Sequence, residues 1–136
     1  MTTNGKISEA TRRLSDWEPW RLAELETNRS NGQVGMRLVS QTDRVRVWQI
    51  CLLPGERLPF HRHQLDYFWT ALTAGCSRSH YGDGSISQTA YDIGMTQHFC
   101  FEPGEAMIHD LENIGETALL FTTVEFKGGA NPPLSL

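Results

Sequence analysis

Short runs of apolar and β-branched residues, each closed by glycine or proline, fill most of this 136-residue chain. In the first clear run, Val45 and Val47 alternate with arginine, and the apolar pattern continues to Leu52. Alternation of this kind places successive side chains on opposite faces of a β-strand. Further β-rich runs cover residues 61–73, 85–89, 97–101 and 119–126. Many short strands at regular intervals predict an all-β sandwich or barrel.

Glycine and proline mark the turns between these runs, at Pro54-Gly55, Gly82-Asp83-Gly84, Gly94 and Pro103-Gly104. The Asp83-Gly84 pair can supply the positive φ angles of a type I′ turn, so residues 85–89 are expected to return as a hairpin strand. We expect a single domain: a barrel over residues 35–127, an N-terminal extension over 1–34 and a tail over 128–136. The tail contains Pro132-Pro133, which cannot pair within a central strand.

The N-terminal extension contains apolar side chains that need a partner surface. Residues 7–14 are expected to be loose or briefly helical. The secondary structure of residues 17–26 is left open, because Pro19 falls where an interior helix would need an amide donor. The large apolar side chains here are Trp17, Trp20, Leu22 and Leu25. We expect them to pack on the outside of the barrel or on a second subunit, and we expect a homodimer.

Composition excludes several classes of partner. Hydrophobic residues make up 39% of the chain and charged residues 21%, as in globular proteins. A formal net charge of -4 offers no basic surface for nucleic acid. No apolar run is long enough to cross a bilayer. Residues 1–12 are polar and do not resemble a secretory signal, so we expect a cytoplasmic protein.

Cysteine usage points to a reducing compartment. Cys51, Cys76 and Cys100 are odd in number and widely spaced, and no CxxC pair occurs. We expect three free thiols at core or near-core positions.

His61-Arg62-His63 is the first feature that carries chemistry. Residues two apart in a strand point to the same face, so both imidazoles can reach one point in space. Histidine nitrogen is a strong ligand for zinc, iron, nickel and copper. In a chain with five histidines, such a pair can arise by chance, and its weight depends on the residues around it.

The surrounding spacing resembles the first motif of the cupin superfamily, G(x)5HxH(x)3-4E(x)6G. The matching positions are Gly55, His61, His63, Phe68 and Gly75. The second cupin motif, G(x)5PxG(x)2H(x)3N, is matched more loosely by Gly94, His109 and Asn113, with Pro103-Gly104 displaced and Ala106 in a glycine slot. The resemblance covers residues 40–127. Residues 61–67 and 109–113 look most like the small cupins of β-alanine degradation, without indicating a substrate.

The resemblance implies an all-β, single-domain double-stranded β-helix, the RmlC-like jelly-roll barrel of cupins. It also implies that His61, His63 and His109 bind a divalent metal such as Fe, Ni, Zn or Mn.

The chain departs from the cupin motif at the glutamate ligand. Position 68 holds Phe68, and position 67, which the shorter spacer would use, holds Tyr67. Three arrangements remain open. In the first, three histidines alone hold the metal, as in thiol dioxygenases of the superfamily. In the second, Gln64, Asp66 or Tyr67 supplies a fourth ligand. In the third, the histidines act without a metal as acid–base or binding groups. We favour the first two arrangements together over the third.

Several neighbours are candidates for the same pocket. Tyr67 and Trp69 share the strand parity of the two motif histidines, if no bulge intervenes. Phe60, Phe99 and Met107 are further candidates for its apolar wall. Tyr67 and His98 are the candidate acid–base residues, although the face on which His98 lies is left open. Arg57, in the loop before the ligands, could meet a carboxylate substrate.

These residues favour a metal-dependent cupin enzyme acting on a small organic molecule by oxygenation, isomerisation or a lyase step. The alternative is a metal-free or non-catalytic cupin that binds a small ligand. A purely structural domain would leave the spacing of the three histidines unexplained.

Overall fold

The protein is described by a computed structural model covering residues 6–8 and 14–136. In chain order its elements are β1 (Lys6–Ser8), the 3-10 helix η1 (Leu14–Asp16), α1 (Pro19–Thr27), β2 (Arg37–Gln41), β3 (Val45–Leu52), β4 (Arg57–His63), β5 (Asp66–Ala71), β6 (Gly75–His80), β7 (Ile86–Tyr91), β8 (Thr96–Phe99), β9 (Met107–Asn113) and β10 (Leu119–Phe126). Strands dominate, so the expected all-β class is confirmed.

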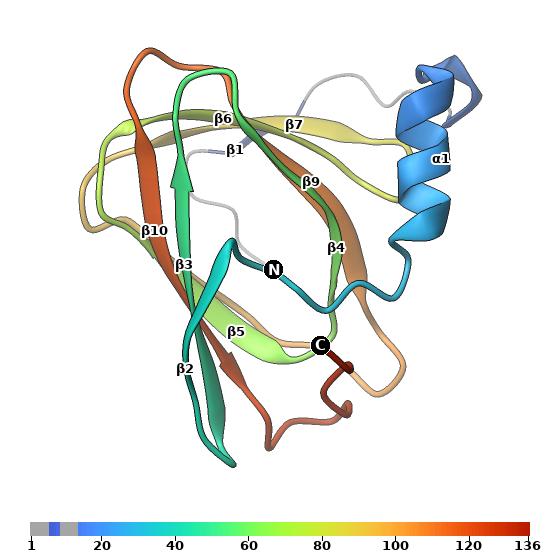
Figure 1. Ribbon diagram of the computed structural model, residues 1–136, viewed down its shortest axis with the longest axis vertical. Helices are drawn as coiled ribbons and strands as arrows, with labels where there is room; N and C mark the ends of the chain where they lie inside the picture. The colour runs from blue at the N-terminus through green and yellow to red at the C-terminus, as the bar shows by residue number, and fades with distance from the viewer. Residues whose placement is uncertain (1–5, 9–13) are drawn as a thin grey trace.

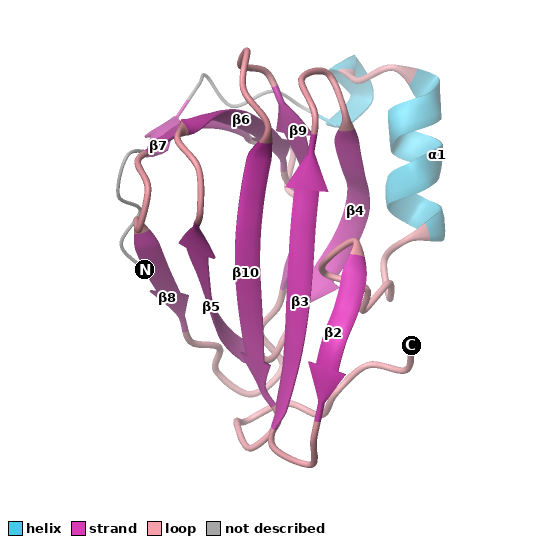
Figure 2. Cartoon of the chain, turned by 60° about the vertical axis from the view of Figure 1, so that its left-hand side comes forward, coloured by secondary structure: helices cyan, strands magenta, loops and turns pink. Residues whose placement is uncertain are grey.

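Two five-stranded antiparallel sheets face each other (Figure 1). One has the order β1-β7-β6-β9-β4 and the other β2-β3-β10-β5-β8. Figure 2 shows the second sheet from its outer side, with β10 between β5 and β3. Neighbours such as β4 and β9 are far apart in sequence, as in a jelly roll. The run predicted over residues 61–73 is divided: β4 ends at His63 and β5 begins at Asp66 in the opposite sheet.

Strand alternation builds the interior of the barrel. Along β10, Leu119, Phe121, Thr123 and Glu125 are buried, while the residues between them are more exposed. β3 follows the same rule, with Arg46, Trp48, Ile50 and Leu52 inside. The apolar core inside the barrel consists of Ile50, Leu52, Leu58, Ala71, Tyr91, Leu111, Leu119 and Phe121. It fills one part of the barrel and leaves the part between β4, β9 and β5 for polar and aromatic side chains.

A second apolar cluster lies outside the barrel, beneath α1. Trp17, Leu25 and Phe60 form it, with Leu22 and Ile108 at its edge. Helix α1 therefore docks on the outer face of β4 and β9 of its own chain (Figure 1). Its start tolerates Pro19 because the first helical position needs no amide donor.

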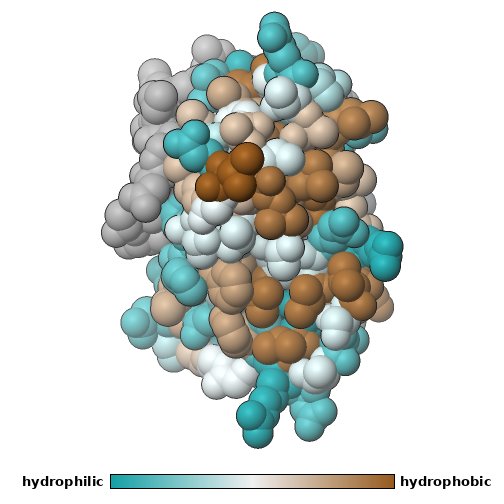
Figure 3. All heavy atoms as spheres, turned by 90° about the vertical axis from the view of Figure 1, so that its left-hand side faces the viewer, coloured by the Kyte–Doolittle hydropathy of each residue, from teal (hydrophilic) through white to brown (hydrophobic). Residues whose placement is uncertain are grey.

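The outer face of the β2-β3-β10-β5-β8 sheet carries exposed apolar residues. Val39 lies in β2, Phe126 ends β10, Leu72 follows β5 and Ile93 lies in the turn before β8. Figure 3 shows apolar side chains gathered on this side of the molecule.

Three local expectations are corrected. Cys51, Cys76 and Cys100 are free thiols as expected, but all three are exposed rather than near the core, because each points out of its strand or follows it. The turn at Gly82-Asp83-Gly84 is not type I′: only Gly84 has a positive φ, of 93°, and Tyr81 pairs with Ser85 across a three-residue loop.

Residues 7–14 were expected to be loose or briefly helical. Instead, residues 7 and 8 belong to strand β1, Leu14 begins the short 3-10 helix η1, and residues 9–13 lie outside the described residues. Among the described residues, no helix has the length and apolar character needed to cross a membrane.

Candidate metal centre

Three histidines meet inside the barrel because β4 and β9 are antiparallel neighbours. His61 in β4 lies directly opposite His109 in β9, and His63 follows two residues along the same inner face. Their rings are 4.6 to 5.1 Å apart, centroid to centroid. One potential ligand atom from each lies within 4.8 Å of the other two. The structure thus brings together the three histidines that the motif spacing singled out.

The nitrogen separation fits a metal ion. Nε2 of His63 lies 3.2 Å from Nε2 of His109. Two nitrogens each about 2.1 Å from an ion would be about 3.0 Å apart at a right angle and about 3.4 Å apart at a tetrahedral angle. Without an ion, one of these nitrogens must carry a proton and donate it to the other. The donor set of imidazoles suits Zn, Fe, Ni or Cu.

His61 is held with one nitrogen directed to the cluster. Its Nδ1 lies 2.8 Å from the carbonyl oxygen of Pro59. Because a carbonyl only accepts hydrogen bonds, Nδ1 carries the proton and Nε2 keeps the lone pair that a metal needs. Burial lowers the pKa of His61 to about 4, although the bond to Pro59 opposes the change. The ring is therefore neutral, as a ligand must be.

His63 is neutral for the same reason and is held differently. Burial, reinforced by the neighbouring His61 and His109, lowers its pKa well below the usual value. Its Nδ1 is buried without a hydrogen-bond partner among the described residues. Instead, the Tyr67 ring stacks on the imidazole at 4.0 Å with 10° between the planes. Tyr67 in turn stacks on Phe99 at 4.5 Å. Aromatic stacking therefore fixes the orientation of this ring.

The cluster lies in a cavity of about 70 Å³. Its wall is mostly apolar and aromatic, and its polar lining comes from Ser79, Tyr81, Thr89, Tyr91, Gln97 and Thr123. Of the described residues, no carboxylate lines it. Burial raises the pKa of Tyr91 to about 12 and that of Tyr67 well above its usual value, so both phenols stay protonated. The side chains of His61, His63, Tyr67 and Tyr91 therefore all enter the cavity uncharged.

Comparison with known proteins identifies the architecture. A cupin domain from Bordetella pertussis Tohama I superposes with a TM-score of 0.58 at 24% identity, over 68% of this chain and 91% of that one. A conserved double-stranded β-helix protein from Klebsiella pneumoniae gives 0.53 at 25% identity, over 69% and 76%. An RmlC-like cupin family protein from Methanocaldococcus jannaschii gives 0.53 at 20% identity, over 66% and 76%. This chain has the cupin fold. No protein-family model and no curated protein matches the sequence.

The cupin barrel shows which residue stands where the motif glutamate would reach the metal. Phe68 points to the outer face, where its ring lies 5.1 Å from that of His98. Tyr67 is the inward residue, beside His63. With the shorter spacing of the motif, the glutamate position falls on this inward tyrosine.

Neither Gln64 nor Asp66 supplies a fourth ligand here. Gln64 accepts a hydrogen bond from Nε of Arg62 and donates one to the carbonyl of Pro132. Asp66 accepts one from the amide of Phe101. Both belong to the connection where the chain passes between sheets, and both lie outside the histidine cluster. Leu65, between them in the chain, is the buried residue of this connection.

Of the five side chains expected in the pocket wall, Tyr67 and three others line the cavity and Phe60 does not. Trp69, Phe99 and Met107 line the cavity beside Tyr67. Phe60 faces the other way and packs under α1, because it alternates with His61 along β4. His98 is exposed on the outer face. Its neighbour Gln97 is buried and lines the cavity, a residue that strand parity with Phe99 could have identified.

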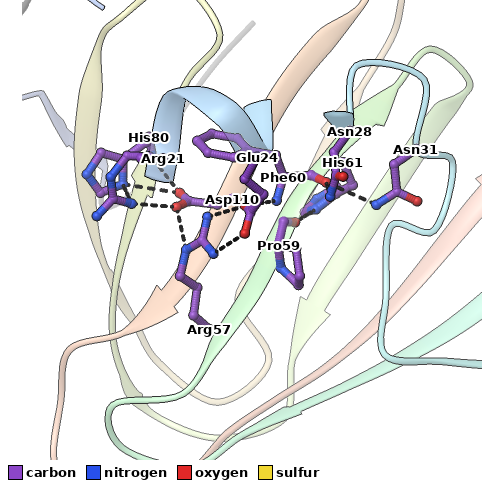
Figure 4. A network of polar contacts seen from close by, with 10 residues as sticks. All are labelled: Arg21, Glu24, Asn28, Asn31, Arg57, Pro59, Phe60, His61, His80 and Asp110. Carbon is purple, nitrogen blue, oxygen red and sulfur yellow. Dashed lines mark hydrogen bonds and ion pairs between the residues drawn. The ribbon is translucent and has the colours of Figure 1, made fainter. Parts of the chain in front are cut away.

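Behind the histidines, on the outer face of β4 and β9, lies a charged network (Figure 4). Asp110 is completely buried and accepts hydrogen bonds from Arg57 at 2.9 Å, Arg21 at 3.2 Å and the His80 amide at 2.6 Å. Burial alone would raise the pKa of Asp110, but the bonds from His80 and the charge of Arg57 lower it overall. Arg57 also binds both carboxylate oxygens of Glu24 in α1. It is thus committed to protein partners, and the expectation that it meets a substrate is corrected.

Proposed function

We propose that this protein is a three-histidine cupin enzyme that binds a divalent metal through His61, His63 and His109 and acts on a small organic anion. The convergence of the three rings in a buried cavity, with the two Nε2 atoms of His63 and His109 3.2 Å apart, carries this proposal. The fold and the neutral state of the buried rings support it.

The charge of the site selects the kind of ligand. Imidazole ligands bind a metal in their uncharged form, so they would leave the full double charge of the ion in a cavity to which the described residues contribute no carboxylate. An uncompensated charge in a low-dielectric space favours an anionic partner, such as a carboxylate or an enolate. A metal with open positions can bind and polarise such a group as a Lewis acid.

The volume and lining of the cavity limit the size of the substrate. At about 70 Å³, the cavity is far smaller than the pockets of several hundred cubic ångströms that hold drug-sized ligands. The aromatic wall suits a molecule with a short apolar part. Oxygenation, isomerisation and a lyase step are each compatible with this setting. We favour a dioxygenase-like reaction among these, because three-histidine sites of the superfamily include dioxygenases.

Metal content tests the proposal. The purified protein is dialysed with Zn²⁺ or Fe²⁺ and analysed for bound metal, beside His63→Ala and a control, His98→Ala, that changes an exposed histidine outside the cavity. We expect one ion per chain in the unmodified protein and in the control, and loss of the ion in His63→Ala. The absence of stoichiometric metal from the unmodified protein would end the proposal.

A metal-free binding cupin is the second candidate. The observation that favours it is Tyr67 in the place of the carboxylate ligand, since a tyrosine protonated at neutral pH adds no charge to hold an ion. Thermal-shift measurements separate the two functions. Stabilisation by small organic acids in the presence of a chelator, with none by divalent ions, would favour metal-free binding.

We also propose a homodimer in a reducing, cytoplasmic setting. Most of the apolar residues around α1 no longer argue for a partner, because Trp17 before the helix and Leu25 within it are buried on their own barrel. Trp20 of α1 is the exception and is 50% exposed. What supports a dimer is the exposed apolar surface on the side of the β2-β3-β10-β5-β8 sheet (Figure 3). Phe126 at the end of β10 is 41% exposed, and Ile93 in the turn before β8 is 75% exposed. Light scattering should give twice the chain mass, and the mass of a monomer would refute the dimer. Three free, exposed cysteines support the reducing compartment.

A further inference from the structure

Strand β4 is irregular immediately before the first histidine. Its pairing with β9 shifts register between Leu58 and His61, so the bulge residues Pro59 and Phe60 have no Cα partner in β9. Proline at the bulge lacks an amide donor and suits a place where the ladder is interrupted. The backbone groups of Phe60, buried under α1, therefore need partners from elsewhere.

Side chains of α1 and the turn after it satisfy these groups (Figure 4). The amide of Phe60 donates to the Glu24 carboxylate at 3.1 Å. Its carbonyl accepts from the side-chain amides of Asn28 and Asn31, each at 3.0 Å. The backbone carbonyl of Asn31 accepts from the amide of Arg62 at 2.7 Å. Helix α1 and its turn thus take the place of a neighbouring strand on both sides of His61.

The bulge is also what orients the first candidate ligand. The freed carbonyl of Pro59 lies 2.8 Å from Nδ1 of His61 and fixes its tautomer. That carbonyl keeps its direction only while the next residue, Phe60, is held at both its amide and its carbonyl. A shift of the bulge would turn His61 away from the other two histidines.

We propose that Glu24, Asn28 and Asn31 are positioning residues of the metal centre, and that docking of α1 and binding of the metal at His61 stabilise each other. This inference rests on the proposed metal function and adds to it the segment that organises the site.

The charged network also connects helix α1 to β9, the strand that carries His109. Glu24 binds Arg57 of β4, and Arg57 binds Asp110, which follows His109 in β9. The bond from Arg57 lowers the pKa of Glu24, so this carboxylate is ionised at neutral pH and keeps its partners. Undocking α1 would leave the buried Asp110 without Arg21, which also belongs to the helix. Hydrogen bonds and ion pairs therefore connect the helix, the bulge and both ligand-bearing strands.

Coupling of this kind is reciprocal: whatever weakens helix docking weakens metal binding by the same factor, and metal binding strengthens docking. Residues that orient a ligand histidine through a hydrogen bond affect metal affinity about 10- to 100-fold. We expect effects toward the lower end here, because the three residues act on His61 through the backbone of Phe60.

The test measures Zn²⁺ affinity by chelator competition and the visible spectrum of the Co²⁺-loaded protein. Three variants are compared: Glu24→Gln, Asn28→Asp, which keeps the size of the side chain but removes its donor, and the double variant N28A/N31A. The matched control is Glu26→Gln on the same helix, whose carboxylate is exposed and paired only with Arg29 among the described residues. We expect Kd for Zn²⁺ to rise about 10-fold in the double variant, with an altered Co²⁺ spectrum, and to stay unchanged in the control.

Hydrogen exchange of the unmodified protein supplies a measurement that needs no variant. Amides of residues 19–27 should exchange at least several-fold more slowly with Zn²⁺ bound than with a chelator present. The coupling is wrong if Zn²⁺ leaves the exchange of these amides unchanged. It is also wrong if folded Glu24→Gln and Asn28→Asp bind Zn²⁺ as tightly as the unmodified protein and give the same Co²⁺ spectrum. In both cases the proposed metal function still holds, whereas an unmodified protein that binds neither Zn²⁺ nor Co²⁺ would refute the metal function itself.

Discussion

The ring of Tyr67 stacks face to face on the imidazole of His63, at 4.0 Å between centroids and 10° between planes. With the shorter spacing of the cupin motif, the glutamate position falls on this inward tyrosine. The tyrosine offers the neighbouring His63 an aromatic contact and brings no negative charge to the cavity. Substitution at this position therefore tests the proposed three-histidine site.

Tyr67→Glu should restore a carboxylate beside the metal, whereas Phe68→Glu should not. The first side chain points into the cavity and the second points to the outer face. Without metal, we expect Tyr67→Glu to be about 3 kcal/mol less stable than the unmodified protein, because it loses the buried ring and buries a charge. With Zn²⁺, we expect its Tm to rise more than the Tm of the unmodified protein does. Thermal unfolding with and without Zn²⁺ measures both. Tighter binding in Phe68→Glu than in Tyr67→Glu would show that we have assigned the inward position wrongly.

Acid should destabilise the metal-free protein above the range in which most carboxylates titrate. The pKa of His61 is about 4 in the folded protein and 6.5 in the unfolded chain, so between these values the unfolded state binds more protons. The stability due to neutral His61 is complete above pH 6.5 and is lost as the pH falls toward 4. We expect about 2 kcal/mol to be lost between pH 7.5 and 5.

Urea unfolding in a chelator at the two pH values measures this loss. His61→Gln serves as the comparison, because glutamine does not titrate and the variant should lose less stability over the same interval. His63, whose pKa is also lowered, acts in the same direction, and Glu125, whose pKa is raised, acts in the opposite one. Equal losses in both proteins would contradict the neutral, buried state of His61.

Glu125 should be needed for its hydrogen bond and not for its charge. It is buried, its pKa is raised by burial, and it accepts the indole N–H of Trp48 at 2.7 Å. Glu125→Gln keeps a hydrogen-bond acceptor, so its free energy of unfolding at pH 7 should stay within about 1 kcal/mol of that of the unmodified protein. Glu125→Leu leaves the buried indole N–H of Trp48 without an acceptor and should lower the free energy of unfolding by roughly 1–3 kcal/mol. Chemical denaturation at pH 7 separates the two variants. A glutamine variant as unstable as the leucine variant would mean that the charge itself is required.

Gln97 and His98 should differ in their effect on ligand binding although they are adjacent. Gln97 lines the cavity and His98 lies outside it. Gln97→Ala should change the affinity of the Zn²⁺-loaded protein for small carboxylates such as acetate or pyruvate several-fold, and His98→Ala should not. Calorimetric titration measures both affinities. An effect confined to His98→Ala would place the ligand on the outer face.

Much of the fold was predictable because strand alternation and turn residues are local signals. The runs at 45–52 and 119–126 match β3 and β10. The spacing of His61 and His63 is a property of one strand and was predictable too. Their meeting with His109 was inferred from a motif, since the pairing of β4 with β9 joins residues far apart in the chain.

What sequence alone did not reveal depends on irregular backbone and on tertiary contacts. The chain leaves one sheet at Gln64-Leu65 and enters the other, so parity could not place Gln64 or Asp66. Alternation with His61 along β4 already indicates that Phe60 faces away from the pocket. The surface that buries it there belongs to the segment around α1, whose structure the sequence left undecided. Arg57 appeared free for substrate until its partners, Glu24 and Asp110, were brought beside it from distant positions.

The most direct test of the central claim is a crystal of the Zn²⁺-soaked protein, measured on both sides of the zinc absorption edge. We predict one strong anomalous peak inside the barrel, about 2.1 Å from Nε2 of His61, His63 and His109, with no carboxylate among its ligands. A barrel without anomalous density at the three histidines, or with the peak only at surface residues such as His98, would contradict the account.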